Sequence, residues 1–92
     1  MHLESTSQEP PYRTGTIKHL KLSEIQEMLP DVQPDTRPSS DRKVTLMWRF
    51  LVDGKLCGIW NYRKSYEACG ELSTFGPDEI FRTVFGEAYS RL

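Results

Sequence analysis

The sequence predicts an α+β domain in which a three-stranded antiparallel sheet is covered on one face by a C-terminal helix. Two observations support this prediction. Asp53-Gly54 separates two segments rich in β-branched and aromatic side chains, which is a strong short signal for a β-hairpin. Residues 77–92 carry apolar side chains at helical spacing. The elements follow the order α-β-β-β-α along residues 16–92, which we expect to form one domain.

The N-terminal third of the chain shows little periodicity. Residues 1–15 contain paired prolines and no apolar pattern, so we expect a disordered tail. A short helix is expected within residues 16–29, where Ser23 and Gln26 form a capping-box pattern and Pro30 stops the helix. Residues 17–22 either extend this helix or form a short extended stretch before it. Residues 30–43 hold three prolines and few apolar side chains, so we expect a loop.

The sheet is expected to consist of residues 44–52, 55–63 and 71–75. The last helix opens at Gly76-Pro77, because proline suits the first helical position. Gly86 interrupts the apolar stripe of this helix. It indicates either close backbone packing or an early end of the helix.

A two-residue turn at Asp53-Gly54 fixes the register of the hairpin. The pairs begin at Val52 opposite Lys55 and continue through Leu46–Asn61 and Thr45–Tyr62. One face of the hairpin is then uniformly apolar and is predicted to be the core under the C-terminal helix. Its members are Val44, Leu46, Trp48, Phe50, Val52, Cys57 and Ile59.

The opposite face of the hairpin is unusually apolar for the solvent side of an antiparallel sheet. Gly58 lies opposite the one arginine on this face and leaves room for its guanidinium to cross toward a tryptophan. Either the first helix and the proline loop cover this face, giving three layers, or it stays open as a binding surface. Its candidate partner-binding residues are Met47, Arg49, Leu51, Trp60 and Tyr62.

Composition argues against several classes of protein. The chain has 12 Lys and Arg against 13 Asp and Glu, and it lacks the basic stripe that is typical of nucleic-acid binders. No apolar run is long enough for a transmembrane helix, and no signal peptide is recognisable. Cys57 and Cys69 are too few for a disulfide framework, so we expect two reduced thiols and a cytoplasmic location, with a cross-strand disulfide or metal binding as the less favoured alternatives.

Catalytic and cofactor motifs are missing from the sequence. It contains no C-x-x-C, H-E-x-x-H or glycine-rich phosphate-binding pattern. His2 lies in the predicted tail and His19 lies beside two lysines, and neither has an evident orienting partner. We therefore expect a protein that is not an enzyme and that holds no metal and no small-molecule cofactor.

The favoured interpretation is a small non-enzymatic binding module that acts by protein–protein contact through the aromatic sheet face, with another protein or as a homodimer. The alternative is a nucleic-acid-binding domain. The order of elements is similar to that of double-stranded-RNA-binding domains, and sheet aromatics can stack on bases of RNA or single-stranded DNA. Gly76-Pro77-Asp78-Glu79 stands where those domains place lysines, and its carboxylates would repel phosphates.

Overall fold

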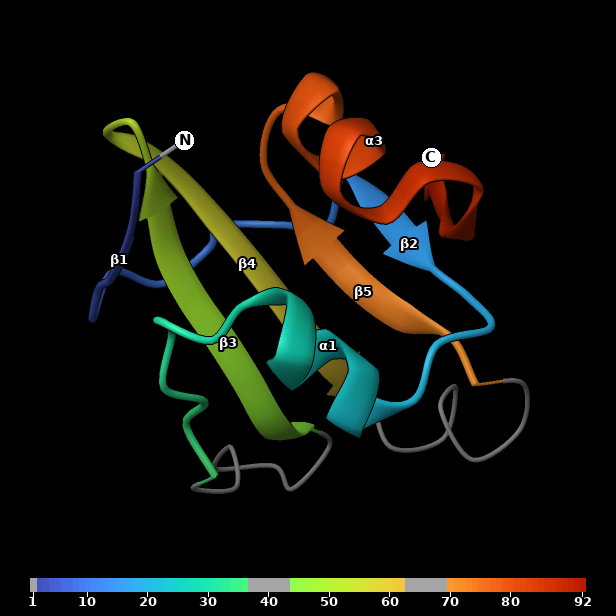
Figure 1. Cartoon of the computed structure of the whole chain (residues 1–92), viewed down its shortest axis with the longest axis horizontal. Helices are drawn as coiled ribbons and strands as arrows, with labels where there is room; N and C mark the ends of the chain where they lie inside the picture. The colour runs from blue at the N-terminus through green and yellow to red at the C-terminus, as the bar shows by residue number, and fades with distance from the viewer. Residues whose placement is uncertain (1, 37–43, 63–69) are drawn as a thin grey trace.

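The computed structural model describes residues 2–36, 44–62 and 70–92, and within them it shows a six-stranded antiparallel sheet with two α-helices (Figure 1). The strand order is β1-β3-β4-β5-β2-β6. The α+β class, the antiparallel sheet and the C-terminal helix are confirmed. The predicted three-stranded sheet is wrong, because three short strands from the two ends of the chain extend it.

The elements fall into two groups. The three strands predicted from sequence are the centre of the sheet, as β3 (Val44–Val52), β4 (Lys55–Tyr62) and β5 (Leu72–Phe75). The three additional strands are β1 (Leu3–Ser5), β2 (Gly15–Ile17) and β6 (Tyr89–Arg91). The helices are α1 (Leu22–Met28) and α3 (Asp78–Phe85), followed by the single 3₁₀ turn η1 (Gly86–Ala88).

Residues 2–15 differ from the disordered tail that the sequence suggested. Strand β1 pairs with β3, with Leu3 opposite Val52, and the buried strand β2 pairs with both β5 and β6. Of the short extended stretch expected as one alternative at residues 17–22, only Ile17 lies in β2, and Leu22 already begins α1. Strands of three residues are too short to show an apolar alternation, and their pairing with distant strands orders them.

The hairpin turn has the predicted geometry. Asp53 and Gly54 have φ values of 50° and 84°, as a type I′ turn requires. The predicted register is confirmed from Val52–Lys55 down to Met47–Trp60.

Beyond Met47 a β-bulge changes the register, so the two predicted pairs at the far end of the hairpin are wrong. Val44, not Thr45, lies opposite Tyr62. The backbone N–H of Leu46 donates instead to the side-chain oxygen of Asn61 at 2.8 Å. An extra residue in one strand needs a partner for its freed N–H, and the buried Asn61 supplies it. The bulge also moves Val44 away from the predicted core face.

Helix α1 begins one residue before the predicted capping box. The Lys21 backbone N–H donates to Glu24 Oε1 at 3.0 Å, so the Ser23–Gln26 box is wrong. Gln26 instead accepts a hydrogen bond from the indole nitrogen of Trp48 at 3.2 Å. This bond shows that α1 lies on the Trp48 side of the sheet.

Helix α3 ends early, as one of the two interpretations of Gly86 expected. Gly86 has φ 59°, and the chain turns through η1 into β6 rather than continuing as a helix to residue 92. Tyr89 lies in β6, where its hydroxyl donates to Asp78 Oδ1 at 2.5 Å. The apolar repeat of residues 77–92 therefore comes from two elements, α3 and β6, that pack on the same core.

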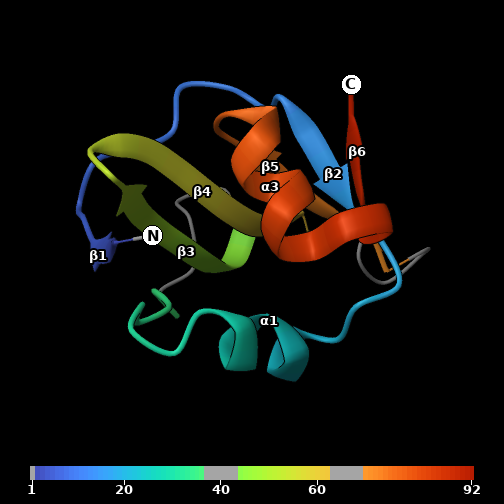
Figure 2. The same cartoon turned by 45° about the horizontal axis from the view of Figure 1, so that its top comes forward.

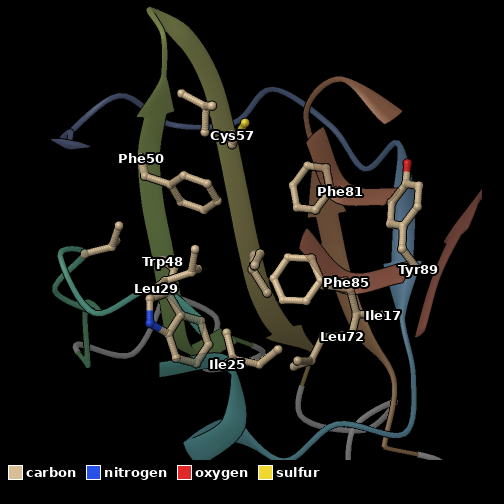
Figure 3. Packing of buried hydrophobic residues seen from close by; sticks show 13 residues of the cluster. Ile17, Ile25, Leu29, Trp48, Phe50, Cys57, Leu72, Phe81, Phe85 and Tyr89 are labelled. Carbon is tan, nitrogen blue, oxygen red and sulfur yellow. The ribbon is translucent and has the colours of Figure 1, made fainter. Parts of the chain in front are cut away.

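Both helices cover the same face of the sheet (Figure 2). Their buried side chains meet those of the sheet in one cluster (Figure 3), so the predicted packing of the C-terminal helix on the Trp48 face is confirmed. The three-layer interpretation, with α1 over the opposite face, is wrong. The cluster consists of Ile17, Ile25, Leu29, Val32, Trp48, Phe50, Val52, Cys57, Ile59, Leu72, Phe81, Phe85 and Tyr89.

Phe81→Ala should lower the free energy of unfolding by about 3–5 kcal/mol, because Phe81 is fully buried at the centre of α3 and its loss leaves a cavity. Its neighbour Arg82 is exposed, so Arg82→Ala should change stability by less than about 0.5 kcal/mol. Urea denaturation of the two variants measures both values. Equal midpoints for Phe81→Ala and the unsubstituted protein would contradict the core assignment.

Candidate functional site

The face of the sheet opposite the helices, here called the outer face, is crossed by residues 6–14, here called the strap. In Figure 1 the strap passes behind β3 and β4, while α1 and α3 lie in front. Backbone hydrogen bonds fix its two ends. The Thr6 N–H donates to the carbonyl of Arg49 at 3.2 Å, and the Thr14 N–H donates to that of Thr74 at 2.8 Å.

A row of three residues runs across the outer face beneath the strap. Arg49 of β3 pairs with Gly58 of β4, and Gly58 pairs with Phe75 of β5. Residues directly opposite each other in an antiparallel sheet point to the same face. The row therefore presents a cation, a gap without a side chain and an aromatic ring, in that order.

The strap follows this row in sequence order. Glu9 pairs with the guanidinium of Arg49. Pro10 fills the gap over Gly58, since a Cβ placed on that glycine would lie only 2.5 Å from the proline Cγ. The ring of Tyr12 meets that of the third member of the row edge-on, with centroids 5.2 Å apart. The predicted approach of the guanidinium across Gly58 is wrong, because the proline occupies that space.

Arg49 is the electrostatic centre of the outer face. Its side chain is 13% exposed, and its two terminal nitrogens pair separately with Glu9 and Asp35. Asp35 also exchanges two backbone hydrogen bonds with Met47, of 2.7 and 3.0 Å. One guanidinium thus holds two segments of the chain against β3.

The two predicted aromatic anchors have different environments. Trp60 is 5% exposed and buried, so it is not the open anchor that the sequence suggested. Tyr62 is 38% exposed and meets Trp60 edge-on, with ring centroids 6.2 Å apart. The buried tryptophan therefore supports an accessible tyrosine.

A groove of about 520 Å³ lies between the strap and the ends of β3 and β4. Four of the five predicted site residues line it, and Leu51 does not. Leu51 lies nearer the hairpin turn, opposite Glu4 of β1. We call this the aromatic groove, and its lining residues are Glu9, Pro10, Pro11, Tyr12, Arg13, Asp35, Val44, Met47, Arg49, Trp60 and Tyr62.

Sequence reasoning missed the contributions of Glu9, Pro10 and Asp35. Two signals pointed to them. An arginine on an apolar face needs a carboxylate, and a glycine opposite it leaves a gap that another group must fill. Neither signal says which acid or which apolar residue meets the need.

The positions of the histidines, cysteines and candidate metal ligands can be given for the described residues. Across residues 2–36, 44–62 and 70–92, no three His, Cys, Asp or Glu side chains are grouped as metal ligands. His2 lies 3.6 Å from Glu4 on exposed β1, and His19 is exposed before α1. Cys57 is a free, buried thiol, and Cys69 lies outside the described residues.

None of the helices in the described part of the chain is both long and apolar enough to cross a membrane.

Arg49→Lys should loosen the strap, because one ammonium cannot reproduce a fork that binds two carboxylates through separate nitrogens. We expect a loss of about 1–3 kcal/mol in stability and faster amide exchange at Thr6, whose N–H donates to the Arg49 carbonyl. Arg13→Lys is the matched control, since Arg13 meets one carboxylate at 3.7 Å on the surface. An unchanged amide-exchange rate at Thr6 in Arg49→Lys would show that this ion pair does not hold the strap in place.

Cys57 should react with thiol reagents only when the protein unfolds. Burial raises the pKa of its thiol to about 12, and the nearby Lys55 only partly offsets this. At pH 8 the reactive thiolate is then on the order of one molecule in 10,000. A Cys69→Ser variant isolates this thiol, and mass spectrometry after mild alkylation should find it unmodified until denaturant is added. Rapid labelling of the folded variant would contradict the burial of Cys57.

Comparison with known proteins finds no matching family model, no similar curated protein and no similar solved structure. Functional inference for this chain therefore rests on the geometry of the outer face.

Proposed function

We propose that the protein is a non-enzymatic binding module that contacts a protein partner through the aromatic groove. The observation behind this proposal is the half-covered state of the groove. Tyr62 is exposed and meets a buried tryptophan edge-on, and the exposed Tyr12 lines the same groove. Tyrosine, tryptophan, methionine and arginine, which all line this groove, are enriched at protein–protein interfaces.

The charges that line the groove support a protein partner over a nucleic acid. Glu9 and Asp35 are matched in number by Arg13 and Arg49, and both arginines already lie beside carboxylates. A phosphate backbone needs several uncompensated cations along its path. A partner of mixed polarity needs none, and it gains most from the aromatic rings.

The proposal includes a cytoplasmic location and leaves two kinds of partner open. A free thiol at Cys57 suits a reducing compartment, where disulfides are rare. The partner is either a different protein or a second copy of this chain. The same variants distinguish the two when their oligomeric state is measured.

Tyr62→Ala should lower the affinity for the partner at least about tenfold, because an exposed aromatic anchor on a rigid support is a typical hot spot. Met28→Ala is the matched control, since Met28 is 37% exposed on α1, on the opposite side of the sheet. The partner is captured with the tagged, unsubstituted chain from its native cells, and its affinity for all three proteins is measured by calorimetry.

Equal affinities for Tyr62→Ala and Met28→Ala would exclude the aromatic groove as the binding site. A partner that is a nucleic acid, with an affinity that falls steeply with added salt, would contradict the protein-binding function itself. Analytical ultracentrifugation of the isolated proteins tests the homodimer version, which requires a dimer that Tyr62→Ala weakens.

A further inference from the structure

The strap occupies part of the outer face in the way that a bound peptide would. Four successive residues, Glu9 to Tyr12, lie over the row of Arg49, Gly58 and Phe75, and each member of the row meets one of them. These residues belong to no helix or strand. Extended proline segments that dock in aromatic-lined grooves are a recurring mode of peptide recognition.

Each of the three residues in the row suits a different type of side chain. Arg49 offers a planar fork, which suits a carboxylate. The gap over Gly58 is bordered by the Trp60 ring, 3.5 Å from where a Cβ would lie, and it accepts the flat ring of a proline. Phe75 offers a ring edge or face to an aromatic side chain. The row therefore matches the pattern acidic residue, proline, any residue, aromatic residue.

We propose that this row recognises a partner segment of the same pattern, and that the strap covers the row until such a segment displaces it. This inference rests on the proposed function, and it specifies the partner and the regulation of the outer face. The occupant to which it commits is an extended segment of another protein.

The contacts that the strap makes with the row are weak enough to be replaced by those of another segment. The Glu9 side chain is 70% exposed, and Asp35 still neutralises the Arg49 guanidinium when Glu9 leaves. Tyr12 is also largely exposed. The backbone anchors at Thr6 and Thr14 lie outside the four residues that cover the row. Those four residues can therefore leave while both ends of the strap stay attached.

A partner segment gains contacts that the strap does not make. The wall of the aromatic groove that β3 and β4 form adjoins the row and stays in place when the strap leaves. Its exposed Tyr62 meets the ring of Trp60 edge-on. A segment longer than the strap can continue from the row into this groove. The strap competes as a tethered ligand at high effective concentration, so it lowers the apparent affinity of the intact protein.

The test uses the full chain and a synthetic peptide that copies residues 5–14, with both ends blocked and a fluorescent label. A variant with Glu9→Ala and Pro10→Ala loosens the strap and leaves the row intact. We expect it to bind the peptide at least ten times more tightly than the unsubstituted protein in fluorescence anisotropy. A peptide carrying the same two alanines is the control ligand and should bind at least ten times more weakly.

Gly58→Ala, added to the loosened variant, tests the gap over Gly58 that the proline ring fills. Its methyl group takes the place of the proline ring, so peptide affinity should fall at least tenfold. The indole N–H signal of Trp48, which reports the contact with α1, verifies by NMR that each variant is folded. Should the double variant fail to fold, Tyr12→Ala loosens the strap at an exposed position and takes its place.

Equal peptide affinity in the loosened and unsubstituted proteins, or no effect of Gly58→Ala, would overturn the inference. A dimer in which two copies exchange straps, detected by ultracentrifugation, would also overturn it, because the occupant would then be a second copy. These results are distinct from the Tyr62→Ala test. If Tyr62→Ala abolishes partner binding but the peptide does not bind, only the proposed sequence pattern is excluded. If the peptide binds but Tyr62→Ala leaves the affinity for the partner unchanged, only the groove is excluded as the partner site.

Discussion

The pairing of Arg49 with two carboxylates is the interaction on which the outer face depends. A charged side chain among apolar neighbours is costly unless it is paired, and a guanidinium has enough donors to satisfy two acids at once. Glu9 and Asp35 come from segments without regular structure, so this charge determines where both segments lie. The strap in turn leads the chain from β1 at one edge of the sheet to β2 near the other. The six-stranded sheet follows from that crossing.

The same two segments also cover the edge of β3. Strand β1 pairs with its last three residues, the Thr6 N–H meets the Arg49 carbonyl, and Asp35 forms a bridge with Met47. A long apolar strand with an unpaired edge is prone to join other chains. One set of contacts thus neutralises the buried cation and satisfies the backbone of the longest strand in the sheet. This double role explains why the three central strands β3, β4 and β5 are extended by strands of only three residues.

The parts of the fold that could be predicted are those with local causes. The turn at Asp53-Gly54 fixes the register, so the sequence places Met47, Arg49, Trp60 and Tyr62 on one face and Trp48 on the other. The register fails only at the bulge, where the Leu46 N–H donates to the side-chain oxygen of Asn61 instead of to a backbone carbonyl. The three short strands could not be predicted, because their pairing partners lie tens of residues away. A covered outer face was one of the two alternatives, but the segment that covers it was expected to be a disordered tail.

The two faces of the sheet are covered by different physical means. On the inner face the helices satisfy their own backbone groups and bury large side chains, so they cannot leave without unfolding the core. On the outer face the strap has few backbone partners of its own between its two anchors. Pro10 and Pro11 have no N–H, so neither leaves an unpaired backbone donor against the apolar outer face. Their fixed φ also lowers the entropy lost when the strap docks. Prolines therefore make an extended segment stable enough to cover an aromatic face and weak enough to be replaced there. Replacement on this face leaves the helical core intact, which is the property that a covered binding surface requires.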